Sequence, residues 1–329
     1  MDKADLNPAN GWRVVVPATS ANLGCAFDCA GLALKLYLHA LFLPSGDGNN
    51  LSLEYHGKTP DRFPLESSNL VLHALRYAAE KLGAPVPTGH VQVQSEIPIS
   101  VGLGSSAAAV IAGLLLGARH SGKDATPEQI LRWAEEIEGH IDNAAAAYYG
   151  GLVLALSNNV ERVSTVKANF PESIRLVVVT PSIVVPTHEA RQVLPKAYDR
   201  ADVLHTLQRT SLLAATCFSG RFELFPELFD DRLHQPYRKK LVPGMDRCLG
   251  LRLPGLLGVA ISGSGSSVIA FADGNEQIIA AKLQQVFSEE GVQTEALFTS
   301  ADNNGAGVTR EQVRLTEKVG SGLQKLERL

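Results

Sequence analysis

The chain has 329 residues, too many for one small domain, so two domains are expected. Hydrophobic residues make up 45% of it and charged residues 19%, which supplies a large core and excludes general disorder. The net charge of −4 at pH 7 argues against a general nucleic-acid binder or membrane-surface binder.

The first half of the chain alternates strand-like and helix-like stretches. Its predicted strands are residues 12–17, 34–43 and 90–97, and its predicted helices are residues 68–82, 105–119 and 126–138. Ser67 or Ser68 is expected to cap the first of these helices. Thr126 begins a capping box at the third, with proline at the first helical position.

The second half has a different order of elements. Strands are predicted at 174–180, 257–262, 267–271 and 294–298, and helices at 201–218 and 276–289. The resulting order, β-α-β-β-α-β, is that of a ferredoxin-like unit, so the expected fold class is α+β. We place the domain boundary after residue 165, which gives domains 1–165 and 166–308. The tail, 309–329, is polar and charged and is expected to be an appended helix or disordered.

Neither a signal sequence nor a membrane span is predicted. The N-terminal sequence has no apolar stretch of the kind that a secretory signal needs, and the longest apolar run, 107–118, is too short to cross a bilayer. The cysteines, which are Cys25, Cys29, Cys217 and Cys248, form no CxxC pair. We therefore expect free thiols, a cytoplasmic location and no membrane partner.

The segment PISVGLGSSAAA, residues 98–109, predicts an anion site between a strand and a helix. Gly102 and Gly104 allow the backbone to approach an anion, and Ser105 and Ser106 add hydroxyl groups beside the helix N-terminus. No GK[ST] sequence follows, so the loop is not a Walker A loop. The loop contains no lysine or arginine, so backbone dipoles and Mg²⁺ would have to balance a phosphate. The alternative is a tight glycine turn into a core helix.

Two further segments gather polar side chains. PATSANLGCAFD contains Asn22 and ends in Asp28. These two side chains could receive an ammonium or hydroxyl group, or could simply close the strand with an Asx turn. EGHIDNAAAAYYGG places Glu138, His140 and Asn143, together with Asp142, where a helix breaks. A lone histidine is more often structural, but four polar groups beside a run of alanines favour a site.

Three segments of the second half complete the set. PTHEAR places Thr187 and Arg191 four residues apart, on one face if the segment is helical. YRKKLVPG begins a short basic run at Arg238, which could also be a solvated charge patch. ISGSGSS, with Gly263, Ser264 and Gly265, is a glycine turn that lets a ligand or another backbone come close.

In this order, PATSANLGCAFD, PISVGLGSSAAA and ISGSGSS resemble the three motifs of the GHMP small-molecule kinase superfamily, and the other segments resemble its homoserine kinase family. The resemblance runs from Val14 to Val308. Three positions depart from the family pattern: Ala26 and Ile141 stand where members commonly have glycine and proline, and Ser266 stands where SGSGPS has proline. We expect altered loop stiffness at these positions, and Ala26 is the most doubtful because glycine could be needed there for a positive φ.

The resemblance implies an N-terminal domain like the second domain of ribosomal protein S5, a ferredoxin-like C-terminal domain, and ATP between them. It implies that Ser106 and Glu138 hold Mg²⁺ and that Asn69 lies near the nucleotide base. The implied phosphate-binding residues are Pro98, Ile99, Ser100, Val101, Gly102, Leu103, Gly104, Ser105 and Ser106. The third glycine motif is Gly263, Ser264 and Gly265.

The resemblance also implies the substrate, L-homoserine, and its phosphorylation to O-phospho-L-homoserine in threonine biosynthesis. Guanidinium groups of Arg191 and Arg238 suit its carboxylate, and Asn22, Asp28 and His140 offer acceptors for its ammonium group. Asn143 and Thr187, with Arg191, are the implied catalytic residues. The alternatives are another GHMP kinase or decarboxylase, acting on mevalonate derivatives, shikimate or a sugar, and a non-catalytic metabolite sensor. Members of the family often form dimers, so a homodimer is also expected.

Overall fold

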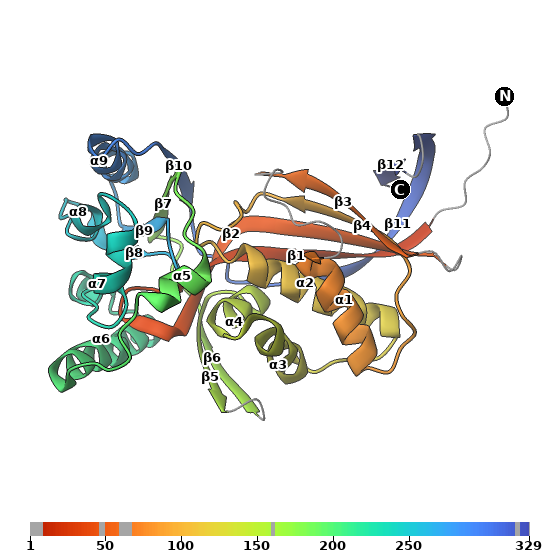
Figure 1. The fold of residues 1–329 in the computed structure, drawn as a ribbon, viewed down its shortest axis with the longest axis horizontal. Coiled ribbons are helices and arrows are strands. Elements are labelled where there is room, and N and C mark those ends of the chain that lie inside the picture. Colours follow the sequence, from red (N-terminus) through yellow and green to blue (C-terminus); the bar gives the residue numbers. More distant parts are fainter. Residues whose placement is uncertain (1–8, 46–49, 59–67, 159–161, 320–322, 329) are drawn as a thin grey trace.

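The computed structural model describes residues 9–45, 50–58, 68–158, 162–319 and 323–328. The molecule has a larger domain, built on a sheet with helices on one side, and a smaller domain at one end of that sheet (Figure 1). Within the described part of the chain, no helix is both long enough and apolar enough to cross a membrane. All four cysteines are free thiols, as expected.

The sheet of the larger domain has eight strands, six of them in the order β12-β11-β1-β2-β4-β3, with β5 pairing β2 and β6. The pair β3–β4 is parallel and the other pairs are antiparallel. The strands are β1 (Ala9–Asn22), β2 (Ala26–Pro44), β3 (Leu51–Gly57), β4 (Gly89–Ser95), β5 (Leu152–Asn158), β6 (Arg162–Ala168), β11 (Gly307–Val319) and β12 (Leu323–Arg328).

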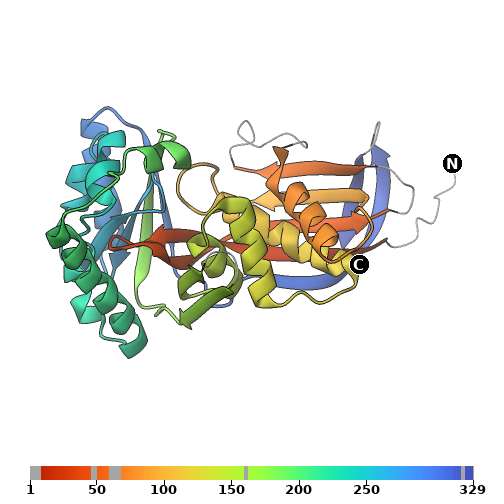
Figure 2. The same ribbon diagram turned by 60° about the horizontal axis from the view of Figure 1, so that its bottom comes forward.

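Apolar helices cover one face of this sheet, as the turned view in Figure 2 shows. They are α1 (Leu70–Lys81), α2 (Ser105–Ser121), α3 (Pro127–Glu138) and α4 (Asp142–Tyr149). The capping box at Thr126 is confirmed. The predicted cap of α1 is wrong: α1 begins at Leu70, so Asn69 and not Ser68 occupies the N-cap position, where its side-chain oxygen accepts the N–H groups of Val71 and Leu72. Ser67 lies outside the described residues.

The smaller domain has the ferredoxin-like order that the sequence predicts. Its antiparallel sheet runs β10-β7-β9-β8, and α9 packs on β7 and β10. The strands are β7 (Arg175–Pro181), β8 (Leu256–Ile261), β9 (Val268–Ala272) and β10 (Thr294–Thr299). The α-helices are α5 (Thr187–Gln192), α6 (Arg200–Ser219), α7 (Gln235–Arg238), α8 (Met245–Leu249) and α9 (Glu276–Glu289), with 3₁₀ turns at Phe222–Glu227 and Lys239–Leu241.

The chain crosses between the domains more often than expected. Residue 165 lies inside β6, so we now propose a division between β6 and β7.

The expectation of a helical or disordered tail is wrong, because β11 pairs with β1 along the residues from Ala9 to Val15. The edge of β1 carries backbone groups that need partners, and the tail supplies them.

The hairpin of β1 and β2 reaches out of the larger sheet into the smaller domain, where its red ribbon passes the helices of that domain (Figure 1). The predicted strands 12–17 and 34–43 are therefore only parts of much longer strands. The turn that joins them is confined to Leu23–Cys25, and the polar residues on either side of it lie at the junction of the domains.

Candidate active site

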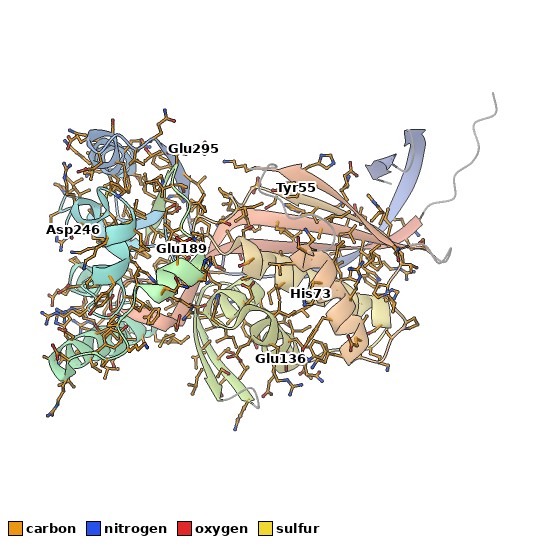
Figure 3. The ribbon with its side chains drawn as sticks, in the orientation of Figure 1. Tyr55, His73, Glu136, Glu189, Asp246 and Glu295 are labelled. Carbon is orange, nitrogen blue, oxygen red and sulfur yellow. The ribbon has the colours of Figure 1, made fainter. Side chains whose placement is uncertain are left out.

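A cavity of about 300 Å³ lies at the junction and is lined by residues of both domains. Figure 3 places Glu189, on α5, at this junction, and Tyr55, a lining residue on β3, toward the larger sheet. Most of the predicted site residues line the cavity. They are Asn22, Asp28, Asn69, Ile99, Ser100, Gly102, Leu103, Gly104, Ser105, Ser106, His140, Asn143, Thr187, Arg191, Arg238, Gly263 and Ser264.

Four predicted residues do not line it. Pro98 and Val101 face a separate groove behind the glycine loop, and the carbonyl of Val101 accepts the backbone N–H of Ser267. Gly265 has a φ of +91° and forms the turn behind Ser264. Glu138 lies beyond the lining but contacts Ser106. Pro98 and Val101 were predicted to face the cavity but do not, because consecutive residues of a loop cannot all face the same side.

The sequence did not predict that Thr19 supports a residue of the site. Thr19 lies on β1, and its hydroxyl donates a hydrogen bond to Oδ1 of Asn143, on α4, at 2.8 Å. The cluster of threonine and serine in PATSANLG was the available signal. Tyr55 was missed as well, because β3 had not been predicted.

The glycine loop exposes the N-terminus of α2. Gly104 occupies the N-cap position with a φ of +65°, and no side chain caps this helix end. A Cβ atom on Gly104 would lie 1.9 Å from Thr19 Oγ1, and one on Gly102 would lie 2.1 Å from the carbonyl oxygen of Ser262. Glycine is therefore required at both positions, and the first N–H groups of α2 are left to bind an anion in the cavity.

Ser106 and Glu138 meet beside this helix end. Ser106 Oγ donates to Glu138 Oε2 at 2.9 Å, and burial raises the pKa of the Glu138 carboxyl above its usual value. Among the described residues, no group of three or more histidine, cysteine, aspartate or glutamate side chains is arranged so that it could hold a metal ion by itself. A hydroxyl and one carboxylate fit Mg²⁺, which commonly takes its other ligands from water and phosphate oxygens.

The start of α4 holds Asp142, His140 and Asn143 in one network. The buried Asp142 carboxylate accepts the backbone N–H of Asn143 at 2.7 Å and its side-chain amide at 3.3 Å. His140 Nδ1 lies 3.1 Å from the same oxygen, and this hydrogen bond raises the pKa of His140. With Thr19 on its other side, the amide of Asn143 is held in one orientation at the cavity wall.

Two arginines of the smaller domain form the opposite end of the cavity. Both terminal nitrogens of Arg191 donate to Asp28, each over 3.0 Å. Arg238 is buried, and it donates to the backbone oxygens of Ala190 and Gly263, both at 3.1 Å. Desolvation lowers the pKa of Arg238 to about 10, which leaves it charged at neutral pH. Its guanidinium carbon lies 5.0 Å from the ring centre of Phe27.

Asn22 supports the site from inside the protein. Its amide donates to the carbonyl of Gly263 at 2.8 Å and its Oδ1 accepts the backbone N–H of Asp28 at 3.0 Å. Asn22 and Asp28 both have positive φ angles, of 70° and 53°, a conformation that is uncommon for non-glycine residues and that asparagine and aspartate adopt more readily than most. Asn22 thus holds the turn that presents Asp28. Thr187 Oγ1 lies 3.3 Å from Ser264 Oγ, which joins α5 to the third glycine motif.

The local backbone accommodates each of the three departures from the family pattern. Ala26 is absent from the described residues with positive φ, so it needs no glycine freedom. Ile141 has a φ of −112°, outside the range that a proline ring allows. Ser266 is buried, and its hydroxyl donates to the carbonyl of Ile183.

Comparisons with known proteins show what the whole chain is similar to. The family models described as "GHMP kinases N terminal domain" and "GHMP kinases C terminal" match residues 69–151 and 212–289. A homoserine kinase of Solibacter usitatus is 36% identical over 93% of this chain and 100% of its own length, and one of Synechocystis is 34% identical over 91% and 98%.

Solved structures extend the agreement to the fold. The crystal structure of homoserine kinase from Cytophaga hutchinsonii superposes with a TM-score of 0.81 at 26% identity, covering 94% of this chain and 99% of that one. Mevalonate kinase of L. major, at 16% identity and a TM-score of 0.64, covers 91% of this chain and 97% of its own, and shares the fold.

Proposed function

The chain belongs to the homoserine kinase family of the GHMP kinases, and we propose that its cavity transfers the γ-phosphoryl group of ATP to the hydroxyl of L-homoserine. The products are O-phospho-L-homoserine and ADP, and the reaction belongs to threonine biosynthesis. The observation that carries the proposal is that an uncapped helix N-terminus and an aspartate–arginine pair face the same cavity. The homodimer expected from the resemblance stays a prediction.

The phosphates of ATP are proposed to lie on the glycine loop. The N-terminus of α2 offers N–H groups and the positive end of the helix dipole, and Ser105 and Ser106 add hydroxyls. None of the described residues that line this end of the cavity is a lysine or arginine, so the negative charge needs a cation. Ser106 and Glu138 would hold Mg²⁺ there, and the ion, when bound, would neutralise charge on the transferring phosphoryl group.

The substrate is proposed to insert between Asp28 and Arg191. Homoserine is a zwitterion, so its carboxylate can take the place of Asp28 on the guanidinium while its ammonium group binds the released Asp28 carboxylate. Asp28 and Arg191, which pair with each other in the structure, would then each bind a group of the substrate that carries the same charge as the partner it has lost. Arg238 adds positive charge on the carboxylate side, and His140 lies nearer the reacting hydroxyl. A substrate without an amine would leave Asp28 without a partner.

The chemistry is proposed to depend on positioning. The hydroxyl oxygen of homoserine attacks the γ-phosphorus, the bond to the ADP oxygen breaks, and the hydroxyl proton ends on the transferred phosphate. An amide cannot accept that proton as a base, so Asn143 orients the hydroxyl and stabilises the transition state, and Thr187 contributes a hydroxyl from the smaller domain. The Asp142 carboxylate already accepts three hydrogen-bonding partners and holds Asn143 and His140 in place.

The deciding experiment measures ADP release from MgATP with separate acceptors: L-homoserine, mevalonate, phosphomevalonate, shikimate and galactose. Strong dependence on L-homoserine alone is the expected result. Activity with another acceptor would keep the ATP site and discard the proposed substrate residues. Binding of ATP without ADP release in any of the mixtures would favour a metabolite sensor.

A further inference from the structure

His234 lies behind the substrate end of the cavity and belongs to none of the sequence motifs assigned above. It stands just before α7, its side chain is completely buried, and it does not line the cavity. A buried histidine needs partners for both ring nitrogens, so the contacts of those nitrogens show what the residue does.

The first contact ties His234 to the β1–β2 turn. Its Nε2 lies 2.6 Å from the carbonyl oxygen of Gly24, and this distance requires the Nε2–H to donate. The imidazole also stacks on Phe27, with ring centres 5.1 Å apart and an angle of 22° between the planes. Both contacts are made with the short segment that ends in Asp28. His234 therefore holds the turn that presents the carboxylate.

The second contact faces Arg238. With the proton on Nε2, the ring nitrogen Nδ1 carries a lone pair, and it lies 3.5 Å from a terminal nitrogen of the Arg238 guanidinium. A protonated Nδ1 would place positive charge against the arginine. Burial, in agreement with this geometry, lowers the pKa of His234 to about 4, so the ring is neutral at pH 7.

The surroundings of His234 fix the ring in place. Asp231, one of whose oxygens lies 3.5 Å from Nε2, is already engaged by the backbone N–H groups of Leu233, His234 and Gln235. Gln235 donates to the carbonyl of Phe229 and accepts the backbone N–H of Ile261 on β8. The start of α7 is thus anchored to the smaller sheet, and the imidazole has no freedom to follow a moving partner.

We propose that His234 is a positioning residue that joins the β1–β2 turn and the start of β2, which bears Asp28, to Arg238 of the smaller domain. One ring fixes the separation between the carboxylate that receives the substrate ammonium and the guanidinium that receives its carboxylate. The inference rests on the proposed function, because it concerns the geometry of the same substrate site. It predicts that changes at His234 affect homoserine and leave ATP unaffected.

Two substitutions separate the two contacts. The amide of His234→Gln reaches as far as Nε2 and can still donate to Gly24, whereas His234→Asn reaches only as far as Nδ1 and can still accept from Arg238. Each of these variants loses one hydrogen bond and is expected to raise the KM for homoserine about fivefold. His234→Ala loses both and is expected to raise it about twentyfold or more. The KM for ATP should stay within twofold of the wild-type value. His205→Asn, a change on α6 away from the cavity, is the matched control.

A double-mutant cycle tests whether the effect passes through Arg238. In the Arg238→Lys background, His234→Gln should raise the KM for homoserine by less than it does in the wild-type background, because the contact is already lost. An equal rise in both backgrounds, or a homoserine KM for His234→Ala within twofold of the wild type, would overturn the proposal. An equal rise in the KM values for ATP and homoserine would also overturn it, as the mark of a general loss of structure.

The test does not depend on how much of a variant folds, because it uses KM values and a spectroscopic measurement on the wild type. KM does not depend on the fraction of folded enzyme, so a poorly folding variant still reports. In the wild-type enzyme, ¹⁵N NMR of the histidine rings should show His234 with Nε2 protonated and Nδ1 unprotonated, and homoserine should shift this signal while ATP alone should not. Protonation at Nδ1 would refute the proposal. A wild-type enzyme that releases no ADP with homoserine would instead refute the proposed function and leave the ring geometry to be judged by NMR.

Discussion

Asp28 and Arg191 are 163 residues apart in the sequence and form a bidentate pair with two N–O distances of 3.0 Å. Asp28 comes from the start of β2, just after the turn of the long β1–β2 hairpin, and Arg191 comes from α5 of the smaller domain. Each side chain is more than a third exposed, so the pair is open to the cavity and contributes little to stability by itself. A pair of this kind can be opened by a zwitterion.

Arg191→Ala is expected to raise the KM for homoserine roughly tenfold, because it removes a charged hydrogen bond at a partly exposed position. The variant should also lose its preference for homoserine over 3-aminopropan-1-ol, which lacks the carboxylate. Steady-state kinetics with both acceptors provide the measurement. Arg221→Ala, which removes an exposed arginine paired with Glu223, is the control and should change neither value. An unaltered homoserine KM would remove Arg191 from the site.

Asn143→Ala is expected to lower kcat about a hundredfold, in the range found when a preorganised hydrogen-bond donor is removed from a reacting centre. The affinity for ATP should stay unchanged, because the glycine loop is left intact. Single-turnover kinetics and nucleotide titration separate the two effects. Asn275→Ala, on the surface of the smaller domain, is the control. A wild-type kcat in the Asn143 variant would contradict its role.

Gly104→Ala is expected to lower kcat/KM for ATP at least a hundredfold. Its Cβ would lie 1.9 Å from Thr19 Oγ1, so Thr19 would shift and release Asn143. Gly122→Ala is a closely matched control on the same helix, since its φ is +66° and nothing lies within 4 Å of the new Cβ. The control should lose only about 1 kcal/mol of stability from backbone strain and keep its kinetics. Equal kinetics in the two variants would show that contact with Thr19 is unimportant.

Glu138→Gln is expected to raise the Mg²⁺ concentration needed for half-maximal activity about tenfold or more. The amide keeps the shape of the side chain but loses the negative charge that would attract the ion. Glu136→Gln, two residues earlier on α3 and paired with Lys81 at the surface, is the control and should behave as the wild type. A Mg²⁺ requirement unchanged in the Glu138 variant would exclude this carboxylate as a ligand.

The buried His234 predicts how stability depends on pH. Burial lowers the pKa of His234 to about 4, against the opposing charges of Asp231 and Asp28 and with the help of Arg238. The unfolded chain therefore binds this proton near pH 6.5 and the folded chain only near pH 4, so the stabilisation is complete above pH 6.5 and decreases as the pH falls toward 4. The amount is at most about 3 kcal/mol.

Urea unfolding of the wild type and of His234→Asn, at several pH values from 7 to 4, measures this contribution. The difference in unfolding free energy between the two proteins should shrink as the pH falls, because only the wild type carries the buried imidazole. A difference that is constant with pH would show that folding leaves the pKa of His234 unchanged, contrary to this prediction.

The conformation of the glycine loop, where we propose that phosphate binds, was predictable from the sequence because it depends on neighbouring residues. Gly102, Gly104 and the following serines are neighbours in the chain, and the helix they precede has a strong Ala- and Leu-rich pattern. The ferredoxin-like order of the smaller domain followed from periodicity in the same way. The polar start of α4 was found as a cluster, although the helix that carries it was not, because its eight residues are too short for a clear period.

Contacts between distant segments could not be predicted from any pattern. The sequence contains Asp28, Arg191 and Arg238 but does not indicate that the first two pair or that the third is buried behind them. Nor does it indicate that Asn22 turns inward to support Asp28, or that β11 returns to pair with β1. These outcomes depend on how the two domains pack, which fixes separations over long stretches of chain.

The sequence by itself therefore determined the glycine loop that we propose binds phosphate, the types of charge available for a substrate, and the order of elements in the smaller domain. Backbone conformation and helix termini depend on neighbouring residues, so a motif is enough to specify them. Only the tertiary structure decided which charges face each other and that His234 lies between Gly24 and Arg238. Hydrogen bonds and ion pairs act over a few ångströms, and only packing of the hairpin against the smaller domain brings those groups within that range.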